Sequence, residues 1–123
     1  MTQLKGVVLA HAGLAAAMIG AVEQIAGSNS GLIAVSNADC DRGTLEEKLI
    51  AAVGEGPAVV FIDMPSGSCL FAAMRRLSST AGVRVVTGVN LAMLLEFVFH
   101  RDGSPDEVAE HVAAVGARAV VAR

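Results

Sequence analysis

Short apolar runs rich in β-branched residues alternate with segments of helical periodicity along this chain of 123 residues. Such alternation with short links favours a mostly parallel sheet, because strand-helix-strand crossovers are right-handed and return each strand beside an earlier one. We therefore predict one domain over residues 1–123, a three-layer, doubly wound α/β fold. The expected strands centre on 7–9, 31–35, 58–62 and 83–87, and the expected helices cover 13–25, 44–53, 68–77, 91–99 and a last segment that begins at Ser104.

The ends of several elements carry local signals. Thr44 followed by Glu47 matches a capping box, Asn90 is a preferred N-cap residue, and Ser104 precedes a proline and a glutamate at the start of the last helix. Ala117 to Arg123 is short and rich in β-branched residues, so we expect a short carboxyl-terminal strand. This strand would lie at the edge of the sheet or pair with another subunit.

Composition limits the function classes. Hydrophobic residues make up 54% of the chain and charged residues 17%, a surplus of apolar surface that favours a homo-oligomer. The formal net charge is −3 and the basic residues are scattered, so nucleic acid is not an expected partner. Cys40 and Cys69 are too few for a disulfide framework or a zinc site. Without a secretory segment or a run of about 20 apolar residues, we expect a soluble cytoplasmic protein.

Two ionisable residues stand where buried strands end. His11 follows the first strand, and Asp63 follows the strand at 58–62. In a doubly wound sheet the first and third strands are commonly neighbours, so these side chains should meet at one rim. A carboxylate bound to Nδ1–H would fix the imidazole tautomer and leave the Nε2 lone pair free to attack an electrophile.

The start of the helix after Asp63 offers a place for an anion. Ser66, Gly67 and Ser68 form the turn into this helix, whose first backbone N–H groups and positive dipole end favour a phosphate. Nucleophile, orienting group and phosphate seat together indicate phosphoryl transfer to His11, with no metal and no cofactor. The alternative is that Asp63 and Ser68 only cap a turn and a helix.

These residues resemble a known family, the enzyme IIA domain of the mannose-type sugar phosphotransferase system. The resemblance covers nearly the whole length and rests on the strand ending in His11, on Phe61–Asp63 with Gly67 and Ser68, and above all on the run Val86–Glu96. It implies a phosphocarrier in which His11 is phosphorylated, Asp63 is its hydrogen-bond partner and Ser68 contacts the phosphate.

The resemblance also implies partners. A histidine phosphocarrier protein would donate the phosphate and an enzyme IIB would accept it, and the membrane would be reached only indirectly, through a permease complex. It further implies a homodimer that exchanges a carboxyl-terminal strand matching Ala117 to Arg123. The sugar, the acceptor and the choice between transport and regulation stay open.

The chain differs from the family pattern at four positions. Ala12 stands where glycine usually follows the histidine, Ser66 and Cys69 alter a Gly-Gly-Ser-Pro turn, and Ala92 replaces a proline. A glycine-to-serine change can remove a conformation with positive φ, and loss of proline frees a helix entry. These changes keep a second function open, a non-catalytic regulatory module of the same fold that binds other proteins.

Other site types fit the residues less well. Cys69 and Arg75 have the spacing of a cysteine phosphatase, but the residues between them favour a helix and no phosphate loop. The acidic residues beside Cys40 are typical of a solvated loop, and His100 and His111 fall at or near helix ends. No glycine-rich nucleotide motif is present in the sequence. A metal centre and a nucleotide or flavin site are therefore not expected.

Overall fold

The computed structural model describes residues 3–123, in which strands and helices alternate until two helices follow each other at the end. The elements are β1 (Lys5–Ala10), α1 (Leu14–Ala26), β2 (Leu32–Ser36), α2 (Arg42–Val53), β3 (Ala58–Ile62), α3 (Ser68–Leu77), β4 (Val83–Thr87), α4 (Leu91–Phe99) and α5 (Pro105–Arg118). The longest of these helices, α5, has 14 residues. No helix within residues 3–123 combines the length and the apolar character that crossing a bilayer requires.

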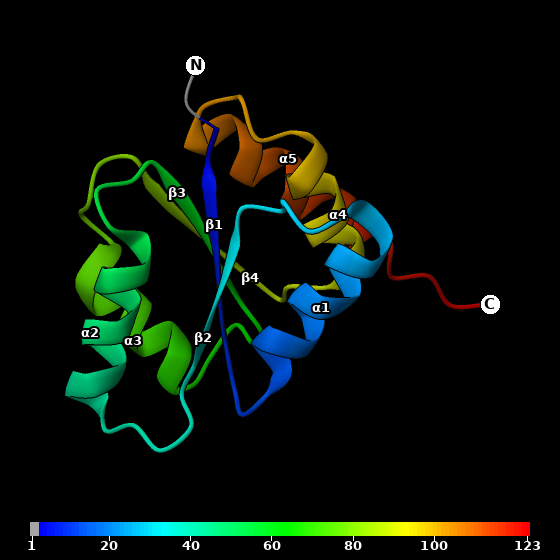
Figure 1. The fold of residues 1–123 in the computed structure, drawn as a ribbon. Helices are drawn as coiled ribbons and strands as arrows, with labels where there is room; N and C mark the ends of the chain where they lie inside the picture. Colours follow the sequence, from blue (N-terminus) through cyan, green and yellow to red (C-terminus); the bar gives the residue numbers. More distant parts are fainter. Residues whose placement is uncertain (1–2) are drawn as a thin grey trace.

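The four described strands form one parallel sheet in the order β2-β1-β3-β4. The chain first adds β2 on one side of β1 and then β3 on the other, so the strand order reverses at the β1-β3 pair. Helices α1, α4 and α5 cover one face of the sheet, and α2 and α3 cover the other (Figure 1). The predicted α/β fold with three layers and a parallel sheet is confirmed.

The two central strands supply both cores. In β1, Val8 packs toward α1, α4 and α5, while Val7 packs toward α2 and α3. In β3, Phe61 packs toward α1, α4 and α5, and Val60 packs toward α2 and α3. All four of these side chains are fully buried. Strands buried on both faces read as continuous apolar runs, which is why residues 7–9 and 58–62 are the clearest strand signals in the sequence.

An aromatic pair fixes the packing on the α4 side of the sheet. Phe97 of α4 meets Phe61 edge to face, with ring centroids 5.1 Å apart and planes at 78°. Gly6 makes room for this ring, because a Cβ at that position would lie 2.7 Å from Phe97 Cε2 and 2.6 Å from Leu32 Cδ2. The absence of a side chain at Gly6 is therefore a packing requirement of β1.

Two of the three predicted helix caps form. The Asn90 side chain accepts a hydrogen bond from the Met93 N–H at 2.9 Å, and the Ser104 hydroxyl accepts one from the Glu107 N–H at 3.1 Å. The prediction of Thr44 as the cap of α2 is wrong. Asp41 caps this helix by accepting from the Thr44 N–H at 2.8 Å, because the helix begins earlier, at Arg42.

The predicted carboxyl-terminal strand does not form within the chain. Residues 117 and 118 belong to α5, and the helical hydrogen bonding continues to the Ala119 N–H, which donates to the Val115 carbonyl at 3.2 Å. Residues 119–123 adopt no regular structure and project away from the body of the molecule (Figure 1). Val120 is 79% exposed, and residues 119–123 pair with no strand among residues 3–123.

Candidate active site

The carboxyl ends of β1 and β3 bring His11 and Asp63 together. These strands pair in parallel, with Leu9 opposite Ile62, so the residues that follow them leave the sheet at the same edge. His11 Nδ1 lies 2.8 Å from Asp63 Oδ2, and the backbone N–H of His11 donates to the same oxygen at 3.0 Å. The expected contact of the two side chains at one rim is therefore present.

The charge on Asp63 determines which imidazole nitrogen carries the proton. Burial alone would raise the pKa of Asp63, but the hydrogen bonds from the backbone and ring of His11 outweigh burial and hold the pKa below its ordinary value. An ionised carboxylate only accepts hydrogen bonds, so we assign the proton to Nδ1. The side chain of His11 is 39% exposed and that of Asp63 only 9%. Nε2 of His11 is thus left with a free lone pair, on an imidazole that is partly exposed.

The amino end of α3 lies beside the imidazole. Gly67 is the N-cap residue with φ of 97°, a conformation that favours glycine, and no side chain caps this helix. A Cβ built on Gly67 would lie 3.9 Å from His11 Cε1 and 4.0 Å from Nε2. Ser66, Gly67 and Ser68 are all exposed. The three predicted phosphate-binding residues therefore stand at the rim, and their binding of phosphate stays a prediction.

The loop after His11 is held by β2. Ala12 has φ of 51°, in the left-handed region that costs an L-residue about 1–2 kcal/mol. Its N–H donates to Asn37 Oδ1 at 3.0 Å, and its carbonyl accepts from the Ser36 hydroxyl at 2.6 Å. The change to serine at position 66 removes no positive-φ conformation, because Ser66 does not have positive φ, whereas Ala12 does. This role of Ser36 and Asn37 was not predictable from the sequence, because it depends on the pairing of β2 with β1.

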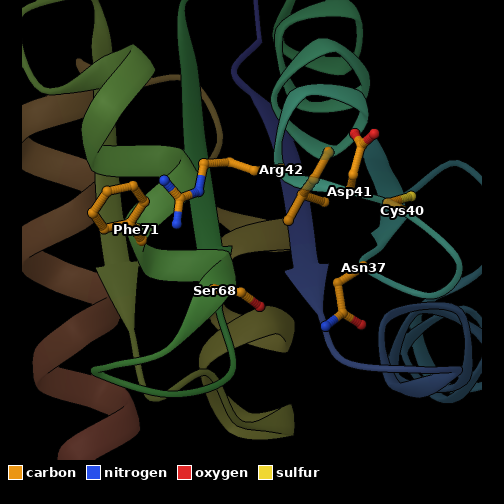
Figure 2. A pocket seen from close by; sticks show the side chains of 7 residues that line it. Asn37, Cys40, Asp41, Arg42, Ser68 and Phe71 are labelled. Carbon is orange, nitrogen blue, oxygen red and sulfur yellow. The ribbon is translucent and has the colours of Figure 1, made fainter.

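A pocket of about 240 Å³ opens beside the rim, between the starts of α2 and α3. Figure 2 shows Arg42 reaching across this pocket to Phe71, and the guanidinium carbon lies 4.5 Å from the centre of the Phe71 ring. Asn37 and Ser68 also line the pocket. Because Asn37 binds the loop after His11, the pocket and the histidine share one wall, and Arg42 places a positive charge there.

Cys69 is not poised for the phosphatase chemistry that its spacing to Arg75 suggests. Residues 69–75 lie within α3, so they form no phosphate loop. Burial, and then the charge of Asp63, raise the pKa of the Cys69 thiol to about 11. Its sulfur lies 4.0 Å from His11 Nδ1 and is fully buried, so Cys69 packs beneath the imidazole as a neutral thiol.

The acidic residues near Cys40 serve structural roles. Asp41 caps α2, and Glu46 accepts from Arg76 at 3.4 Å and pairs with Arg75 at 3.3 Å. His100 and His111 are exposed as expected. They also contact a shared carboxylate, that of Glu96, which sequence spacing did not indicate because His111 lies on another helix.

Comparison with known proteins identifies the family. A family profile described as PTS system fructose IIA component matches residues 5–115, where PTS denotes the phosphotransferase system. No curated protein matches the chain significantly. Among solved structures, the mannose/sorbose-specific IIA subunit of the phosphotransferase system from Enterococcus faecalis matches with a TM-score of 0.88 and 24% identity, covering 99% of this chain and 96% of that one.

A second match is the phosphotransferase system component EIIA from Streptococcus agalactiae, with a TM-score of 0.88 and 20% identity over 96% of this chain and 95% of that one. The PTS IIA protein associated with the fucose utilization operon of Streptococcus pneumoniae matches with a TM-score of 0.71 and 17% identity, covering 99% of this chain and 96% of that one. These structures establish the common fold, and the family profile establishes the relationship. The chain belongs to the family of fructose-type IIA components of the phosphotransferase system.

Proposed function

We propose that this IIA component is a cytoplasmic phosphocarrier that takes phosphate on His11 Nε2 and passes it on. The observation that carries the proposal is the contact of His11 Nδ1 with the buried carboxylate of Asp63 at 2.8 Å. This contact holds the proton on Nδ1 and leaves the lone pair of Nε2 free. One oxygen of the Asp63 carboxylate accepts hydrogen bonds from both the backbone N–H and the ring Nδ1–H of His11. A histidine that only capped the strand end would not need such a buried carboxylate.

The transfer itself needs positioning more than covalent help. Nε2 attacks the phosphorus of a phosphohistidine on the donor, the new P–Nε2 bond forms, and the old P–N bond breaks with its electron pair returning to the donor ring. Asp63 stabilises the positive charge that develops on the imidazole, and the amino end of α3 at Gly67 faces the phosphoryl oxygens. Passing the phosphate to an acceptor reverses these bond changes.

A groove next to the imidazole supports protein partners as donor and acceptor. It has a volume of about 570 Å³ and is lined by Gly67, Phe71, Met74 and Arg75, among others. Phe71 is 50% exposed and Met74 43%, unusual exposure for large apolar side chains. We assign this groove to the histidine phosphocarrier protein that donates phosphate and to the enzyme IIB that accepts it.

His11→Asn is expected to abolish phosphorylation. The experiment incubates the protein with labelled phosphoenolpyruvate and the two general phosphotransferase proteins, and the label on the wild type should be acid-labile and base-stable, as for a phosphoramidate. Asparagine keeps a polar side chain of similar reach but offers no nucleophilic nitrogen. His111→Asn is the matched control, because it removes a histidine far along the chain, on α5, and should leave the label unchanged.

Two outcomes would contradict the assignment. A label of normal amount on His11→Asn would place the phosphate on another residue. If no donor labels the wild type, and a partner protein binds the wild type and His11→Asn equally, the chain would instead be the regulatory binding module that its substitutions at Ser66 and Cys69 left open.

We further propose that two copies form a homodimer through the tail at residues 119–123. The exposed Val120 and Val121 pair with no strand among residues 3–123, and in that part of the chain β2 and β4 each have one open edge. Pairing of the tail with an open strand edge of a second copy would give the two valines a partner and would cover that edge. Light scattering should give twice the chain mass for the wild type and the monomer mass for a chain ending at Arg118, whereas a monomeric wild type would overturn the proposal.

A further inference from the structure

Three side chains with metal-binding groups meet at the junction of α4 and α5. Glu96 lies in α4, His100 caps its end, and His111 comes from α5. Glu96 Oε2 lies 3.1 Å from His100 Nδ1 and 2.6 Å from His111 Nε2. One donor atom from each residue can be chosen so that all lie within 4.8 Å of one another. The three groups therefore converge on one point from two helices.

The local contacts orient these groups. His100 Nδ1 also lies 3.0 Å from the Glu96 carbonyl oxygen, so the imidazole is anchored to the last turn of α4. The two imidazole rings lie 5.3 Å apart at 58°, which lets both face the same carboxylate. An ionised carboxylate and two imidazoles are a ligand set suited to borderline divalent metals.

We propose that Glu96, His100 and His111 form a binding site for Zn²⁺ or a similar first-row divalent metal ion. Imidazole ligands exclude Mg²⁺ and Ca²⁺ as the preferred ions, because these take oxygen ligands. A pocket of about 240 Å³ lies at the same place and is lined by His100 and His111 together with Asp102 and Glu107. Water or one of these carboxylates can complete the tetrahedral shell that three protein ligands leave open.

A second group of potential ligands lies at the phosphotransfer rim and is less suited to zinc. His11, Asp63 and Cys69 also bring donor atoms within 4.8 Å of one another. However, Asp63 Oδ2 already accepts two hydrogen bonds, and Cys69 is fully buried as a protonated thiol. Binding of zinc there would require ionising a buried thiol, whereas at the α4-α5 junction both imidazoles are exposed and Glu96 is half-buried.

Calorimetric titration of the chelator-treated protein with Zn²⁺ alone tests the proposal. The wild type should bind one ion per chain, and His111→Asn and Glu96→Gln should each weaken binding at least about tenfold, since even outer partners of metal ligands change affinity by about 10–100-fold. Circular dichroism of each variant verifies that the fold is retained.

His11→Asn is the matched control, since it removes the other histidine site and should keep the wild-type affinity for Zn²⁺. Loss of binding in His11→Asn with normal binding in His111→Asn would overturn the proposal and move the metal to the rim. Wild-type binding that is unchanged in both His111→Asn and Glu96→Gln, or the absence of binding by the wild type, would also overturn it.

Discussion

Asp63→Asn is expected to slow phosphorylation of His11 by up to about 10⁴-fold, the loss seen when the carboxylate that orients a catalytic histidine becomes an amide. The amide can present its NH₂ to Nδ1, which places the ring proton on Nε2 and removes the nucleophilic lone pair. It also withdraws the negative charge that stabilises the developing imidazolium. The measurement is the single-turnover rate of transfer from a phosphorylated donor protein.

Asp39→Asn is the matched control for this prediction. Asp39 is exposed, and its φ of 57° suits asparagine, so the same loss of one negative charge should leave the rate near that of the wild type. Equal rates for Asp63→Asn and the wild type would contradict an orienting role. A similar slowing in Asp39→Asn would indicate an effect of net charge on donor docking.

The lowered pKa of Asp63 also fixes the sign of a pH dependence. Because the folded-state pKa lies below the unfolded value, the ionised carboxylate stabilises the fold above about pH 4, and this contribution is lost as the pH falls through the folded-state pKa. The difference in unfolding free energy between the wild type and Asp63→Asn should therefore shrink in acid. Urea titrations at neutral and acidic pH measure it.

Phe97→Ala is expected to lower the free energy of unfolding by about 3–5 kcal/mol, the usual cost of truncating a buried aromatic side chain. Phe97 is fully buried, and its removal would leave a cavity against Phe61 and the space that Gly6 keeps open. Urea denaturation at one fixed protein concentration measures the change, because self-association would otherwise alter the apparent stability.

Phe99 on the same helix provides the control for Phe97. Its ring is 66% exposed, so Phe99→Ala removes the same atoms from a solvated position and should change stability by no more than about 0.5 kcal/mol. Equal losses for the two variants would mean that burial against Phe61 adds nothing to what an exposed ring on α4 contributes. A small loss for Phe97→Ala would mean that the core refills the cavity.

The sequence was most informative where burial and chain order act together. The strands at 58–62 and 7–9 were evident because a strand covered on both faces must be apolar throughout. Their adjacency followed from the usual order of a doubly wound sheet, and with it the contact of His11 with Asp63. Local chemistry also sufficed for Asn90 and Ser104, whose side chains cap the helices that they begin.

Features that depend on how separate elements pack were not predictable. The competition between Asp41 and Thr44 for the cap of α2 is decided by where the preceding loop leaves β2. The convergence of Glu96 and His111 depends on how α4 and α5 pack against each other, which residue spacing does not encode. At 117–123 the β-branched residues indicated a strand, but a strand requires a partner, and this segment pairs with no strand among residues 3–123.

The left-handed backbone at Ala12 makes three positions interdependent in evolution. With glycine after the histidine, the loop would need little support, and Ser36 and Asn37 could change freely. With alanine, the two hydrogen bonds from the end of β2 offset the conformational cost, so losing either would release the segment that aims the nucleophile. Lineages that keep alanine at position 12 should therefore retain the hydroxyl at position 36 and the amide at position 37. In lineages where position 12 has returned to glycine, these two residues should vary.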